Sequence, residues 1–199
     1  MRKLLFSRES ERIQPLRELV EKQKHRTLVA WALDCAPRVL AISESRYPQE
    51  LRPRQALETA AAWAQGKVKM PVAKRAIHAA HEAATMMEGD AAAQAAARAV
   101  GHAAATVHVE THALGLVFYG LTAFVYAAPP QASEEIVAKE LQWFIERLAY
   151  WEAHIDQIDT PWAAFLMKDN VPNKELLLRQ KQPLRKDDWR RQGRGTHSV

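Results

Sequence analysis

The sequence predicts an all-α fold, a multi-helix bundle of about six to eight helices with a central apolar helix. Apolar residues recur at three- and four-residue spacing along most of the chain, as they do on one face of a helix. Glycine is rare, at seven of 199 residues, and no segment alternates β-branched and polar residues as a strand does. An apolar content of 48% is ordinary for a chain that buries one core.

Prolines and glycines divide the chain into the expected helices, because proline suits a first turn and glycine ends a last one. Pro37 also predicts a kink or break near Ala36, because proline lacks an amide proton and clashes with the preceding turn. Ten of the fifteen residues from 91 to 105 are alanine, so that helix can approach its neighbours closely. The expected helices cover about 11–24, 26–47, 53–64, 71–88, 91–105, 113–128 and 133–158.

The segment 113–128, ALGLVFYGLTAFVYAA, is the one candidate for a membrane span, since its only polar groups are Thr122 and the tyrosine hydroxyls. A span needs about 20 apolar residues, and this segment has sixteen. No basic cluster flanks it to anchor an orientation. We therefore expect a buried central helix and no membrane span.

Positive charge is concentrated at the C-terminal end. Residues 171–199 carry eight basic and three acidic side chains, which leaves residues 1–170 with 20 of each sign. We therefore divide the chain into a helical bundle domain, 1–170, and a basic C-terminal tail, 171–199. Because residues 1–170 carry no net charge, we do not favour a nucleic-acid-binding face on the domain.

The tail is the alternative place for binding nucleic acid or an anionic surface, because it sets Trp189 among basic residues that would combine phosphate contacts with stacking. A charged chain end is more often a solvated one, so this alternative ranks below the others. The residues expected to make such contacts are Arg185, Lys186, Trp189, Arg190 and Arg191.

Cysteine content and the N-terminal sequence favour a cytoplasmic protein. Cys35 is the only cysteine, so the chain forms no internal disulfide and no cysteine-based zinc site. Only residues 4–6 are apolar at the N-terminus, far short of the roughly 7 to 15 that a secretory signal needs. No glycine-bracketed serine or phosphate-binding glycine loop is present, so we expect no enzyme and no cofactor.

Five of the eight histidines lie between residues 78 and 112, the one compositional hint of a site. His108 and His112 are four residues apart, so on one helix they would share a face and could ligate one metal ion. The Glu-x-x-His motif of di-iron bundles and the His-Glu-x-x-His motif of zinc proteases are both missing. The metal pair is therefore one hypothesis among several.

Two other interpretations of the polar residues stay open. In the simplest, the histidines from 102 to 112 are half-buried and bond to the backbone, while His78 and His81 line a solvated face. In the other, a buried polar network specifies the bundle or forms the floor of a binding pocket, with Asp34 paired because an unpaired buried carboxylate is costly. The members of that network would be Asp34, Arg54, His102, His108 and His112.

Four stretches between residues 25 and 127 carry a family resemblance: LVAWALDCAPRVL, RPRQALETAAAWAQGKV, AIHAAHEAA and VGHAAATVHVETHALGLVFYGLTA. In them the chain resembles the immunity-protein-five-like family, small bacterial helical proteins associated with polymorphic toxin systems. The resemblance implies an all-α fold and the binding and neutralising of a cognate toxin. It transfers no catalytic residue.

Three functions follow from these observations. The first is a non-enzymatic interaction protein, an antidote that binds a toxin and that could also form a homo-oligomer. The second is a small-molecule or metal-binding protein that uses the histidines. The third is binding of nucleic acid or an anionic surface through the tail.

Overall fold

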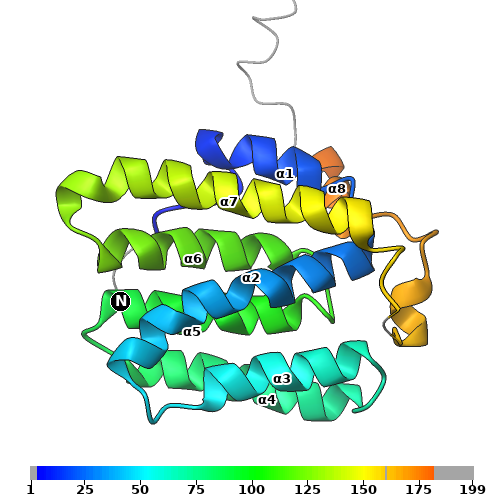
Figure 1. The fold of residues 1–199 in the computed structure, drawn as a ribbon, viewed down its shortest axis with the longest axis horizontal. Helices are drawn as coiled ribbons and strands as arrows, with labels where there is room; N and C mark the ends of the chain where they lie inside the picture. Colours follow the sequence, from blue (N-terminus) through cyan, green and yellow to red (C-terminus); the bar gives the residue numbers. More distant parts are fainter. Residues whose placement is uncertain (1–3, 160, 182–199) are drawn as a thin grey trace, which may run out of the picture.

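The computed structural model describes residues 4–159 and 161–181, and these ranges hold eight α-helices, three short 3-10 helices and no strand (Figure 1). The predicted all-α bundle is thereby confirmed. The α-helices are α1 (Gln14–Val20), α2 (His25–Arg46), α3 (Arg52–Ala64), α4 (Met70–Met86), α5 (Ala91–Ala105), α6 (His112–Ala127), α7 (Ser133–His154) and α8 (Lys174–Lys181). The 3-10 helices are η1 (Glu11–Ile13), η2 (Pro130–Ala132) and η3 (Ala164–Met167).

The helices form layers, with α3 and α4 on one side of the molecule, α7 and α1 on the other, and α2, α5 and α6 between them (Figure 1). The alanine-rich α5 contacts α2, α3, α4 and α6. Eleven of its fifteen residues are buried. Methyl side chains let four helices approach one helix closely, so α5 shares the centre of the bundle with the apolar α6.

The apolar helix α6 is buried as expected. Phe118 is 6% exposed and Leu121 is fully buried. The hydroxyl of Thr122 donates to the carbonyl of Phe118, so the polar group within the apolar stretch has an acceptor. Among the described helices, none combines the length and the apolar content that a membrane crossing requires.

Helix α2 runs without interruption through Pro37, so of the kink or break predicted near Ala36 the break is wrong and the kink stays a prediction. Pro37 lies on the exposed side of the helix, where water can hydrate the carbonyl that loses its intrahelical donor. The buried side of α2 holds α7, because the indole nitrogen of Trp31 donates to the carbonyl of Phe144 at 3.0 Å. The two rings also pack edge to face, with centroids 6.0 Å apart.

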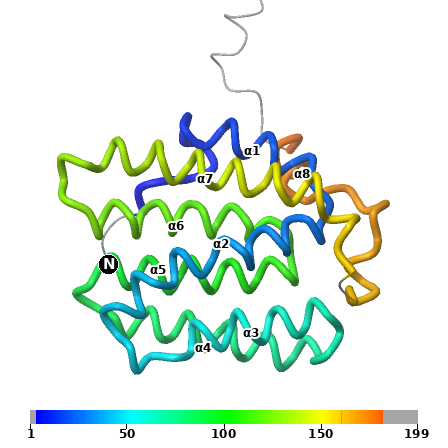
Figure 2. The backbone as a smooth tube through the Cα atoms, viewed as in Figure 1, coloured from blue at the N-terminus to red at the C-terminus, as the bar shows by residue number. Residues whose placement is uncertain are grey.

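After α7 the chain returns across the end of the bundle, and Ala163 donates to the carbonyl of Ala64 at 2.7 Å. The first eleven residues of the segment predicted as a tail, 171–181, include α8, which lies beside α1 (Figure 2). The carboxylate of Glu175 is fully buried, with the Nε of Arg8 at 2.9 Å and the Nε of Arg17 at 3.3 Å. The division of the chain at residue 170 stays a prediction.

Replacing Phe118 with alanine tests the burial of α6. We expect the free energy of unfolding to fall by about 3 to 5 kcal/mol, because the change removes buried apolar surface and leaves a cavity. Urea unfolding measures the difference. Met86→Ala is the control, since Met86 is 73% exposed and its truncation should change the free energy by less than about 0.5 kcal/mol. Equal effects of the two substitutions on the free energy of unfolding would contradict the burial of Phe118 in α6.

Candidate functional site

Three histidines meet where α4, α5 and α6 pack together, and we call His81, His102 and His112 the histidine cluster. The ring centroid of His102 lies 5.4 Å from that of His81 and 5.3 Å from that of His112. The two Nδ1 atoms of His102 and His112 are 3.1 Å apart. One of them must donate and the other accept, so the two neutral rings hold complementary tautomers. The ring of His102 also stacks on Tyr119, with centroids 5.1 Å apart.

Two glycines make room for this cluster. A Cβ atom on Gly115 of α6 would lie 2.5 Å from Nδ1 and 3.1 Å from Cβ of His102. A Cβ atom on Gly101 of α5 would lie 2.6 Å from Cε1 of His81. Each imidazole therefore fills the space that a side chain on the next helix would occupy, and the cluster acts as packing between three helices.

Burial keeps these imidazoles neutral. Desolvation is the main cause that lowers the pKa of His102 to about 3, and the charges that His112, His81, Arg8 and Arg98 carry when protonated act in the same direction. Desolvation is also the main cause that lowers the pKa of His81 and of His112. At neutral pH the cluster is a set of uncharged donors and acceptors.

The pair proposed as metal ligands does not share a helical face. His108 lies in the turn between α5 and α6, while His112 is the first residue of α6, so the i, i+4 geometry is absent. The ring of His108 is exposed and packs on Trp63, with centroids 6.1 Å apart. Within residues 4–159 and 161–181, no group of three or more His, Cys, Asp or Glu side chains is placed to hold a metal ion.

Asp34 and Arg54 lie away from the cluster, so the predicted convergence of five residues is wrong for them. Asp34 faces α7, where it accepts from Nε of Arg147 at 2.7 Å and from the indole of Trp151 at 2.9 Å. Arg54 is exposed on α3 and forms two hydrogen bonds with the carboxylate of Glu44, at 2.6 and 2.7 Å. Of the expected network, only His102 and His112 come together.

Sequence reasoning missed His81, which we placed on a solvated face with His78. His81 is half-buried, whereas His78 is exposed as expected. The signal was present, because His81 lies one turn from the buried Ile77 and three residues before the buried Ala84. A position that borders a buried stripe faces the neighbouring helix.

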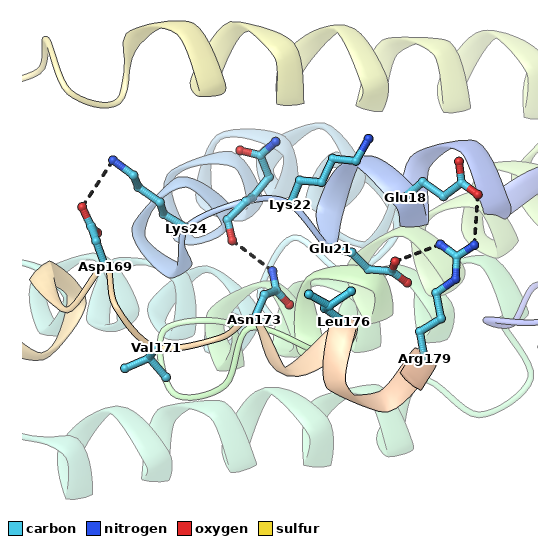
Figure 3. A pocket seen from close by; sticks show the side chains of 10 residues that line it. Glu18, Glu21, Lys22, Lys24, Asp169, Val171, Asn173, Leu176 and Arg179 are labelled. Carbon is cyan, nitrogen blue, oxygen red and sulfur yellow. Dashed lines mark hydrogen bonds and ion pairs between the residues drawn. The ribbon is translucent and has the colours of Figure 1, made fainter. Parts of the chain in front are cut away.

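A second polar region joins α8 to α1 and the loop before α2, and it borders an open pocket of about 550 Å³ (Figure 3). Arg179 donates to Glu21 at 2.9 Å and to Glu18 at 3.1 Å. The side-chain amide of Asn173 donates to the carbonyl of Gln23 at 3.0 Å. Because these groups bond to one another, the region fastens the C-terminal segment to the bundle and leaves few lining groups for a ligand.

Taken together, the fold and the site define an all-α bundle protein whose polar residues lie mainly in helix-to-helix contacts. The chain belongs to the family described as Imm-5 like putative immunity protein, whose sequence model matches residues 18–150. This match confirms the resemblance found in the sequence. No curated protein and no solved structure matches the chain significantly.

The matched range holds α2 to α6, most of α7 and the whole histidine cluster. Arg8, Arg17 and Glu175, which form the buried ion pairs at the end of the bundle, lie outside it. The tail residues Arg185, Lys186, Trp189, Arg190 and Arg191 lie outside the described residues, so their predicted contacts stay predictions.

The lowered histidine pKa values predict acid sensitivity. The unfolded chain takes up protons below its ordinary histidine pKa of about 6.5, whereas His102 in the folded protein stays neutral down to about pH 3. The contribution of the neutral His102 to the stability of the folded protein is therefore complete above about pH 6.5 and is lost as the pH falls toward 3. Between these two pH values His102 contributes a slope of about 1.4 kcal/mol per pH unit to the free energy of unfolding.

The variant His102→Phe keeps an aromatic ring but cannot titrate, so the slope between pH 4 and 6 should decrease by about 1.4 kcal/mol per pH unit. Urea unfolding at a series of pH values measures it. His78→Ala, at an exposed histidine on the same helix as His81, should leave the slope unchanged. An unchanged slope in His102→Phe would show that this histidine titrates alike in both states.

Proposed function

We propose that this protein is a non-enzymatic antidote that binds and neutralises a cognate protein toxin. The observation that supports the proposal is the family match over residues 18–150, which spans the core of the bundle. A preformed bundle is suited to such a role, since a rigid surface loses little conformational entropy when it binds.

The outer side of α2 and α7 has the composition that protein interfaces favour. The guanidinium of Arg38 forms two hydrogen bonds with the carboxylate of Glu140, at 2.7 and 2.8 Å, and lies 4.8 Å from the ring centroid of Trp143. The carboxylate thereby fixes the arginine over the indole. Such an arginine–aromatic pair is ordered before any partner arrives.

The same arrangement repeats further along α7. Arg147, held by Asp34, lies 4.4 Å from the ring centroid of Tyr150. Tyr150 is 41% exposed and stacks on His154, with centroids 4.3 Å apart. Tryptophan, tyrosine and arginine are enriched among the residues that dominate binding energy, so we propose this arginine–aromatic face as the toxin-binding surface.

The other two functions have less support from the described residues. The histidine cluster is packed against glycine backbone and presents no group of metal ligands there. Binding of nucleic acid through the tail rests on the sequence alone.

Coexpression with the product of a neighbouring toxin-like gene tests the proposal. We expect growth rescue and a stoichiometric complex in size-exclusion chromatography with light scattering. Trp143→Ala and Tyr150→Ala should each weaken binding about tenfold or more, as truncations at the centre of an interface do. Met86→Ala, on the exposed side of α4 across the molecule from α7, is the matched control and should bind as wild type (Figure 1).

Two results would contradict the proposal at different levels. Absence of both rescue and complex for every neighbouring gene product would count against the antidote role. A complex that forms with unchanged affinity in the Trp143 and Tyr150 variants would keep the role and reject the arginine–aromatic face.

A further inference from the structure

The C-terminal helix α8 buries its acid and exposes two of its leucines. Between residues 167 and 181, Glu175 is the one buried residue, and its side chain is fully buried. Leu177 and Leu178 are 37% and 42% exposed. The last buried apolar side chain before this stretch is that of Leu166, in η3. Apolar burial therefore holds the chain as far as residue 166 and contributes little to the docking of residues 169–181, which we call the strap.

Buried charges hold the middle of the strap. Oε1 of Glu175 lies 2.9 Å from Nε of Arg8 and 3.3 Å from Nε of Arg17. The backbone amide of Lys174 donates to Oε1 of Glu110 at 2.9 Å, and Glu110 is itself 5% exposed. The strap therefore meets the bundle through ionised groups that both sides have withdrawn from water.

Exposed ion pairs fasten the two ends of the strap (Figure 3). Nη2 of Arg179 lies 3.1 Å from the carboxylate of Glu18, and Nζ of Lys24 lies 3.3 Å from the carboxylate of Asp169. All four side chains are at least 37% exposed. Exposed pairs of this kind contribute little stability and are screened by salt.

These contacts specify where the strap lies without giving it a large docking free energy. The attraction within a buried ion-pair group is largely offset by the desolvation of its charges. Helix α8 has eight residues, fewer than the roughly 12 to 15 that an isolated helix needs in water, so it is helical only while it is docked. The docked and released states of the strap therefore lie close together in free energy.

We propose that the strap is a polar latch, which docks and releases as one unit while the rest of the bundle stays folded. Release lets water reach Arg17, Glu21 and Glu110, which are 3%, 5% and 5% exposed while the strap is docked. Hydration of these charges offsets the ion pairs that release breaks, so opening the latch leaves no bare charge in the core. The strap lies outside the family-matched residues 18–150, so this proposal is independent of the antidote role.

Hydrogen–deuterium exchange of the full chain, read by mass spectrometry, tests the latch. We expect the amides of α8 to exchange about a hundredfold or more faster than those of the buried helix α5, because they open without global unfolding. Glu175→Gln leaves Arg17 short of a counter-ion only while the strap is docked, so it should speed exchange in the strap about tenfold or more and leave α5 unchanged. Leu178→Ala, at an exposed position of the same helix, is the matched control and should change neither.

Two further measurements keep the test decisive if Glu175→Gln does not fold. Arg179→Ala removes an exposed fastening and should speed exchange in the strap alone. Raising the salt concentration from about 0.1 M to about 1 M shortens the screening length from about 10 Å to about 3 Å, and it should speed exchange in the strap relative to α5. Equal exchange rates for the strap and α5 in the wild-type protein would overturn the proposal. Faster exchange in α5 as well as in the strap of Arg179→Ala would also overturn it, because the strap would then open only when the whole bundle unfolds.

Discussion

The bundle depends on how closely α5 approaches the helices around it. Alanine side chains cover most of its surface, and at two points the approach is closer than alanine allows. There Gly101 and Gly115 leave space that the imidazoles of His81 and His102 fill. Large buried rings pack at other helix contacts, such as the fully buried pair Trp31 and Phe144 between α2 and α7.

A group of ion pairs lies at the end of the bundle, where the N-terminal and C-terminal segments meet. Arg8 and Arg17 precede the family-matched range and Glu175 follows it, yet the three side chains form one ion-pair group, in which Arg17 and Glu175 are buried and Arg8 is half-buried. Removing one member of such a group leaves uncompensated buried charge, which is why these contacts fix the position of α8 firmly. These contacts hold the flanking segments against the family-matched core. The proposed antidote role uses the outer side of α2 and α7 within that core.

Most of the fold could be predicted because its signals are local. Helix periodicity, prolines at helix starts, and glycines at helix ends are set by backbone geometry within a few residues, and α3 to α7 begin and end close to where these residues indicate. The contacts of the site depend on helix orientation, which no local pattern specifies. Asp34 was expected among the histidines and instead faces α7, and Glu175 resembled a solvated acid in a charged tail although it is fully buried.

A double-mutant cycle on Gly115 and His102 tests the account most directly, since it asks whether the missing side chain and the imidazole share one space. We expect Gly115→Ala to lower the free energy of unfolding by about 1 to 3 kcal/mol, as overpacking does. In the His102→Ala background that cost should vanish, and alanine should stabilise α6 by up to about 1 kcal/mol through its higher helix propensity. An equal cost of Gly115→Ala in both backgrounds, measured by urea unfolding, would contradict the account.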